Sequence, residues 1–98
     1  MSAFFIATST IIDSKKISEY AQAAAKTFPT YGGQPVLKGK FDETLTNNEG
    51  IPHQAVGVIQ FPSLESLKNW YQSADYQALI PLRDEAAHMT ISSYSVPG

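Results

Sequence analysis

The 98-residue sequence contains no cysteine. This absence excludes disulfide bonds, thiolate metal sites and a cysteine nucleophile, and it fits a reducing compartment. The sequence also lacks any apolar run approaching the roughly 20 residues that a membrane-spanning helix needs. Its first apolar stretch has no basic segment before it and is interrupted by Thr8, Ser9 and Thr10, so no signal peptide is expected. We therefore expect a cytoplasmic protein that does not bind a membrane.

Positive charge is also scarce in this sequence. Seven basic residues against nine acidic ones give a net charge of −2, and Lys15-Lys16 is the only adjacent basic pair. Affinity for nucleic acids rests on clustered lysine and arginine, so no nucleic-acid partner is expected. The two histidines, His53 and His88, have no metal-ligand spacing with each other or with acidic residues. We expect neither a metal site nor a cofactor.

Hydrophobic periodicity predicts a single domain over residues 1–98 with six elements. Strands are predicted at 3–12, 35–41, 54–61 and 90–96, a first helix after the Asp13-Ser14 cap, a long connection at 42–53, and a second helix from Ser63 to His88. The second helix contains a break at Ser73 and then Pro81, which either kinks it or begins a new segment. The order strand, helix, strand, strand, helix, strand predicts a ferredoxin-like α+β fold, a four-stranded antiparallel sheet with both helices on one face.

The first strand is apolar on both of its faces. Phe4 and Ile6 alternate with Phe5 and Ala7, whereas a sheet with one face in water would alternate apolar and polar residues more cleanly. The face without helices must therefore be covered. We predict a homodimer formed through this sheet face.

Arg83 is the only arginine, and helical periodicity places it on an apolar face beside Leu82 and Ala86. The positions three and four residues away carry no acid, so no partner is expected within its own helix. Because an unpaired buried charge costs several kcal/mol, Arg83 needs a carboxylate or an anionic ligand. Two interpretations stay open. One is a structural ion pair with Glu49 or Asp42, with Glu49 favoured, and the other is an anchor for a bound anion.

Several short motifs are shared with a known family: Phe61-Pro62-Ser63, Trp70-Tyr71, Ser73, Tyr76 and Arg83, preceded by Tyr31-Gly32-Gly33 and Glu49-Gly50 and closed by Gly98. In these motifs the chain resembles the domain of unknown function 1330 family (DUF1330) of the dimeric α/β-barrel superfamily. The resemblance implies a ferredoxin-like protomer whose sheet packs face to face in a homodimer. It implies no catalytic residue, because the family has no settled reaction. Where the family pattern has an arginine in the second strand, this chain has Lys38 or Lys40, which lack the planar fork of arginine.

Other candidate site residues carry two interpretations each. His53, at a loop-to-strand junction, is a weak catalytic candidate as a general base, and otherwise an ordinary surface histidine. His88 is expected at a helix C-terminus facing solvent, where its cationic form suits the helix dipole. Trp70, Tyr71 and Tyr76 cluster around the helix break, either lining a pocket for a flat ligand or packing in the core.

Three functional hypotheses follow from these residues. The first is a small homodimeric protein that binds an aromatic or carboxylated metabolite near Arg83. The second is a cofactor-free monooxygenase- or isomerase-type enzyme in which Arg83 polarises an oxygen and His53 or a tyrosine moves the proton. The third is a structural dimer with no ligand. A cavity beside Arg83 would favour the first two over the third.

Overall fold

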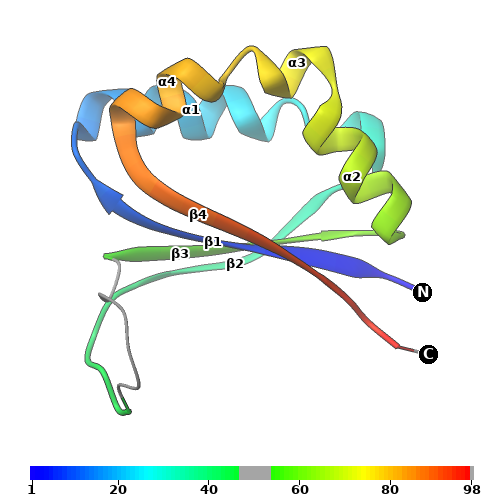
Figure 1. Cartoon of the computed structure of the whole chain (residues 1–98), viewed down its shortest axis with the longest axis horizontal. Helices are drawn as coiled ribbons and strands as arrows, with labels where there is room; N and C mark the ends of the chain where they lie inside the picture. Colours follow the sequence, from blue (N-terminus) through cyan, green and yellow to red (C-terminus); the bar gives the residue numbers. More distant parts are fainter. Residues whose placement is uncertain (47–53, 98) are drawn as a thin grey trace.

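A computed structural model describes residues 1–46 and 54–97. The elements are β1 (Ala3–Ile11), α1 (Ser14–Ala25), the 3-10 helix η1 (Pro29–Tyr31), β2 (Gln34–Lys40), β3 (Ala55–Phe61), α2 (Leu64–Gln72), α3 (Ala74–Gln77), α4 (Ile80–Ala86) and β4 (Ala87–Ser95). The strands form an antiparallel sheet in the order β2-β3-β1-β4. All helices lie on one face of the sheet (Figure 1), so the predicted ferredoxin-like fold is confirmed.

Side-chain caps begin the main helices where the sequence predicts them. Asp13 Oδ1 accepts hydrogen bonds from the backbone N–H groups of Lys15 and Lys16, both at 3.0 Å, at the start of α1. Ser63 Oγ caps α2 and Ser73 Oγ caps α3 in the same way. Such caps satisfy backbone donors that a helix leaves free at its N-terminus. The break at Ser73 is therefore the start of a new helix.

The last helix begins as one of the two predicted alternatives has it, but ends earlier than predicted. Pro81 lies in the first turn of α4, where its missing N–H costs no hydrogen bond, so it begins a segment and does not kink one. The helix ends at Ala86, and β4 begins at Ala87. His88 is therefore an exposed strand residue opposite Thr10 of β1, and its predicted position at a helix C-terminus is wrong. Pairing with β1 extends the strand toward α4 and shortens the helix.

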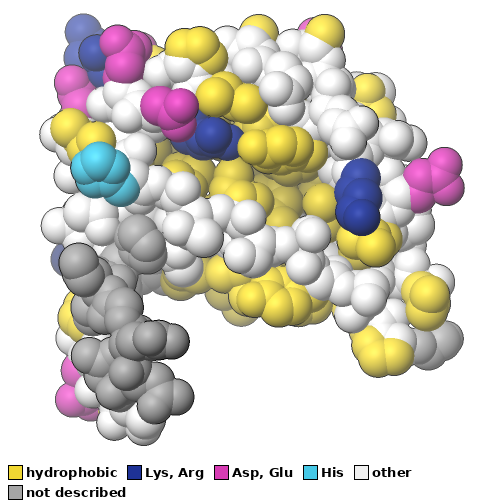
Figure 2. Space-filling view, viewed as in Figure 1, with side chains coloured by type: hydrophobic (Ala, Val, Ile, Leu, Met, Phe, Trp, Pro, Cys, Tyr) yellow, Lys and Arg dark blue, Asp and Glu magenta, His cyan; other side chains and the backbone are white. Residues whose placement is uncertain are grey.

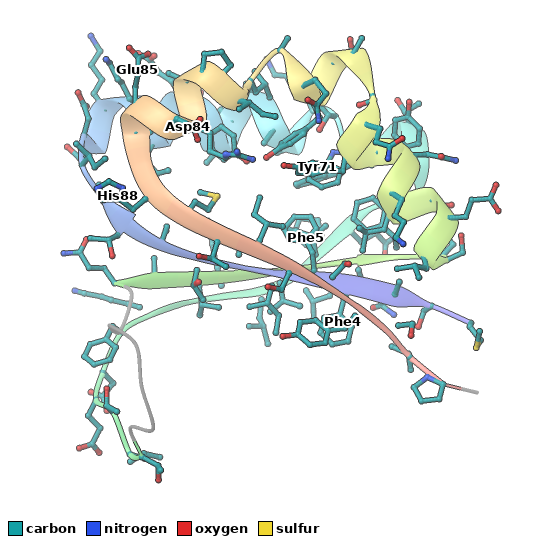
Figure 3. The ribbon with its side chains drawn as sticks, in the orientation of Figure 1. Phe4, Phe5, Tyr71, Asp84, Glu85 and His88 are labelled. Atoms are coloured by element: carbon teal, nitrogen blue, oxygen red, sulfur yellow. The ribbon has the colours of Figure 1, made fainter. Side chains whose placement is uncertain are left out.

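The core lies between the sheet and the helices. Phe5 of β1 points toward the helices (Figure 3) and stacks on Trp70 of α2 with 4.9 Å between ring centroids. Its neighbours Phe28 and Phe61 complete an aromatic group that contacts the same Trp70 ring. This aromatic packing holds α2 on the sheet and thereby positions the site described below.

The opposite face of the sheet carries apolar side chains with no described helix over them. Phe4 points to this side (Figure 3) and stacks on Tyr94 of β4 at 5.3 Å. Ile6 of β1 lies opposite Val58 of β3, which lies opposite Leu37 of β2. Tyr94 is 48% exposed and Leu37 58% exposed. We call Phe4, Ile6, Leu37, Val58 and Tyr94 the uncovered apolar face.

Candidate functional site

Arg83 lies on α4 with its side chain only 15% exposed. Its Nη1 donates a hydrogen bond to the Tyr76 hydroxyl at 3.0 Å and makes a longer one, 3.5 Å, to the Tyr71 hydroxyl. Its Nε donates to Asp84 Oδ1 at 3.3 Å. The prediction that its own helix offers no acidic partner is therefore wrong, because the adjacent residue supplies one. Asp84 is 66% exposed, so water weakens this ion pair.

The sequence predicted two acidic partners for Arg83, Glu49 and Asp42. Glu49, the favoured one, lies outside the described residues, as does the candidate base His53. Asp42 is described and exposed, and within the described ranges it forms no ion pair with Arg83. The hydroxyls of Tyr71 and Tyr76 lie next to the guanidinium.

A chain of hydroxyl groups leads from Arg83 into the core. The Tyr76 hydroxyl lies 2.8 Å from that of Tyr20 on α1, and both rings are buried. Burial raises the pKa of the Tyr20 hydroxyl well above its ordinary value, and the neighbouring Tyr76 adds to the effect. Tyr20 therefore stays protonated. Sequence reasoning missed its link to Arg83 because Tyr20 and Tyr76 are 56 residues apart.

The charge on Arg83 is stabilised by its surroundings. Burial by itself disfavours the guanidinium, but hydrogen bonds to Tyr71 and Tyr76 outweigh it and raise the pKa of Arg83. A guanidinium carries five N–H donors, two of them on Nη2. Among the atoms of residues 1–46 and 54–97, none accepts a hydrogen bond from Nη2. The two N–H groups of Nη2 are therefore not used by the described part of the chain.

A cavity of about 330 Å³ adjoins this group, between α2 and β4. Figure 2 shows it as a hollow floored by hydrophobic side chains. Its lining residues are Leu67, Lys68, Trp70, Tyr71, Gln72, Ile91 and Ser93. Tyr71 points from α2 into the space above β4 (Figure 3), and its hydroxyl is the one that Arg83 approaches. Arg83 does not itself line the cavity and is connected to it through the Tyr71 hydroxyl.

The three aromatic residues predicted around the helix break do different things. Trp70 and Tyr76 are buried, and their ring centroids are 4.3 Å apart. Trp70 Nε1 also donates to Thr27 Oγ1 at 2.7 Å, which ties α2 to the end of α1. Tyr71 is only partly buried. Core packing is thus shown for two of the three, while Trp70 and Tyr71 also line the cavity.

The rest of the described chain offers few competing sites. Within residues 1–46 and 54–97, no three histidine or acidic side chains are grouped to hold a metal ion. None of the helices in these ranges is long and apolar enough to cross a membrane. Lys38 and Lys40 are exposed on β2, and neither lines the cavity.

Comparison with solved structures identifies proteins of the same fold. RPA0582, a protein of unknown function from Rhodopseudomonas palustris, superposes with a TM-score of 0.82 at 13% identity, covering 99% of this chain and 83% of that one. SnoaB, a cofactor-independent oxygenase from Streptomyces nogalater, gives 0.70 at 8% identity, covering 99% and 94%. A dimeric ferredoxin-like protein of unknown function from Thermobifida fusca gives 0.64 at 13% identity, covering 98% and 92%.

Sequence comparison is more specific about the family. No protein with a curated description matches the chain. The family model for a domain of unknown function, DUF1330, matches residues 2–95, almost the whole sequence. The chain therefore belongs to the DUF1330 family.

Proposed function

We propose that this protein binds a small aromatic carboxylate in the cavity between α2 and β4, with Arg83 as the anchor for the carboxylate. One observation carries the proposal: a cationic guanidinium with two N–H donors unused by the described residues lies beside the hydroxyl of Tyr71, and Tyr71 lines the cavity. Nη2 can donate to a carboxylate oxygen, and a hydrogen bond between two charged groups is stronger than one between neutral groups.

The lining of the cavity supports the same class of ligand. Tyr71 offers a ring surface and Ile91 an aliphatic one, while Trp70 and Leu67 are almost fully buried behind them. None of the lining residues is acidic, and the acidic group beside Arg83, Asp84, is exposed to water, which weakens its repulsion of an anion. Small-molecule sites run from roughly 300 to 1,000 Å³, and a cavity of about 330 Å³ lies at the lower end of that range. A molecule built on a single ring fits this volume best.

The test is the Arg83→Gln variant, which removes the charge and keeps a polar side chain of related length. We expect the affinity for benzoate, measured by isothermal titration calorimetry, to fall by about 10- to 100-fold, the value of a lost charge-assisted hydrogen bond. Arg83→Lys keeps the charge but lacks the planar guanidinium, so its affinity for benzoate should lie between those of wild type and Arg83→Gln.

The matched control is Lys15→Gln, which removes a positive charge from an exposed residue that does not line the cavity. It should bind benzoate as the wild type does. Equal affinity of wild type and Arg83→Gln, or no benzoate binding by the wild type, would contradict the proposal. A large loss of stability in Arg83→Gln without any loss of affinity would instead favour the structural ion pair with Glu49.

We further propose that two copies pair through the uncovered apolar face. Large exposed apolar patches on a sheet mark protein interfaces, and here Tyr94 and Leu37 remain about half exposed. Face-to-face packing of this kind would cover Phe4 and Ile6 as well. A dimeric protein of the same fold from Thermobifida fusca agrees with this assembly.

Ile6→Lys tests the dimer because it places a charge at the middle of the uncovered apolar face. We expect wild type to sediment as a dimer at micromolar concentration and the variant to sediment as a monomer, since an unpaired charge buried in an interface is costly. Ile12→Lys is the control, because Ile12 is 54% exposed just before α1 and lies outside the sheet. A monomeric wild type would refute the proposed assembly.

An enzymatic role is a second candidate, favoured by the hydroxyl chain from Arg83 through Tyr76 to Tyr20. Arg83 would polarise a carbonyl or enolate oxygen of the bound molecule, and the partly exposed Tyr71 hydroxyl would give it a proton and take the proton back. The protonated hydroxyls of Tyr76 and Tyr20 would hold the guanidinium in place. That a cofactor-independent oxygenase shares the fold is compatible with such chemistry. Chromatography of the bound acid after incubation with the protein distinguishes turnover from binding alone.

A further inference from the structure

We infer that the ligand of this cavity carries an oxygen acceptor at each end, with its carboxylate held by Arg83 and a second acceptor held by Lys68. This inference rests on the proposed function and specifies the substrate class for the same cavity. The ligand class is a single aromatic ring with a second negatively charged or strongly accepting oxygen opposite the carboxylate.

The first step is the position of Lys68 on α2. It lies three residues before Tyr71, and side chains three apart on a helix share one face. Both residues line the cavity, and the Tyr71 hydroxyl is the one that Arg83 approaches from α4. Lys68 therefore lies one helical turn farther from Arg83 than Tyr71 does. Figure 2 shows basic side chains on opposite sides of the hydrophobic floor of the hollow.

The second step is that the charge of Lys68 is not neutralised by the described chain. Lys68 is exposed, and within residues 1–46 and 54–97 it forms no ion pair, even with Glu65 on the preceding turn of α2. Arg83, by comparison, has Asp84 beside it. Gln72 and Ser93, the other polar lining residues, both carry hydrogen-bond donors. The end of the cavity at Lys68 thus offers a positive charge that no described residue neutralises.

The third step concerns the space between the two cations. Leu67, Trp70 and Ile91 line it with apolar surface, which suits a ring and offers no partner to a polar group in the middle of the ligand. The two ends also differ in kind. Arginine suits the paired oxygens of a carboxylate, whereas the compact ammonium of lysine accepts any single oxygen acceptor. The ligand therefore binds in one orientation, with its carboxylate at Arg83 and its second acceptor at Lys68.

The experiment compares two acids of similar shape, terephthalate and 4-methylbenzoate, which differ in whether the second end is charged. We expect wild type to bind terephthalate about three- to fivefold more tightly, the range of a solvent-exposed ion pair. Lys68→Met should abolish this preference, so that terephthalate and 4-methylbenzoate bind with similar affinity, because methionine keeps an apolar side chain but carries no charge. Raising the salt concentration should reduce the preference in wild type.

The controls separate this inference from the proposed function. Lys15→Met removes an exposed charge away from the cavity lining and should keep the preference. A Lys68→Met variant that still prefers terephthalate would overturn the role of Lys68 while leaving Arg83 as the anchor. If Arg83→Gln bound both acids as tightly as wild type does, the proposed function would fail, and the two-ended ligand with it.

Discussion

Trp70→Ala is expected to lower the free energy of unfolding by about 3–5 kcal/mol, the usual loss when a buried tryptophan is truncated. Trp70 is 1% exposed and lies at the centre of the aromatic core. Its ring stacks on Phe5 at 4.9 Å and contacts Tyr76 at 4.3 Å. Its indole N–H also donates to Thr27. The substitution removes contacts with β1, α3 and the end of α1 at the same time. The neighbouring side chains can therefore fill only a small part of the space that the indole ring leaves in the core.

Urea denaturation followed by far-ultraviolet circular dichroism measures this loss, because Trp70 is the only tryptophan and the variant has no indole fluorescence. Trp70→Phe is the matched variant, since it keeps a ring against Phe5 and loses the N–H that binds Thr27. The free energy of unfolding of Trp70→Phe should lie between those of wild type and Trp70→Ala. A loss below about 1 kcal/mol in Trp70→Ala would mean that α2 is not held by this core.

The parts of the fold that depend on local chemistry could be predicted from the sequence. Asp13, Ser63 and Ser73 cap helices because a side-chain oxygen can accept from backbone N–H groups two or three residues ahead. The start of β4 could not be predicted in this way. His88 joins the strand because it pairs with β1, which lies almost eighty residues earlier in the chain. Pairing between distant segments leaves no local pattern to find.

In the candidate site, too, local features could be predicted and contacts between distant residues could not. Helical periodicity alone was enough to place Arg83 toward the interior, and the structure agrees. Its partners depend on side-chain directions and on contacts between helices, so Tyr76 and Tyr20 could not be assigned to it beforehand. Asp84 was missed for a different reason. Adjacent helical residues point apart, yet the long arginine side chain lets Nε reach its neighbour.

The glycine pair that follows η1, Gly32 and Gly33, contains two positions with different requirements. Gly32 has φ 76°, a left-handed conformation that favours glycine and ends η1. Position 33 requires glycine because the neighbouring rings leave no room for a side chain. A Cβ there would lie 2.7 Å from Phe61 Cε2 and 3.0 Å from Phe28 Cβ. Both rings are buried, at 1% and 7% exposure, so neither can move aside without disturbing the core.

Gly33→Ala is therefore expected to lower the free energy of unfolding by about 1–3 kcal/mol, as overpacking of a tight core does. Gly57→Ala is its control, because a Cβ on Gly57 meets nothing within 4 Å. That variant should be neutral or stabilised by up to about 1 kcal/mol, since alanine restricts the unfolded chain. Urea denaturation of both variants, monitored by Trp70 fluorescence, gives the comparison.

Equal stability of Gly33→Ala and Gly57→Ala would show that η1 can shift away from Phe61. In that case α2 would not be fixed relative to the chain that follows α1. A well-formed cavity beside Tyr71 requires the opposite result, because Phe61 and Trp70 pack in the same core and Trp70 forms part of the cavity lining.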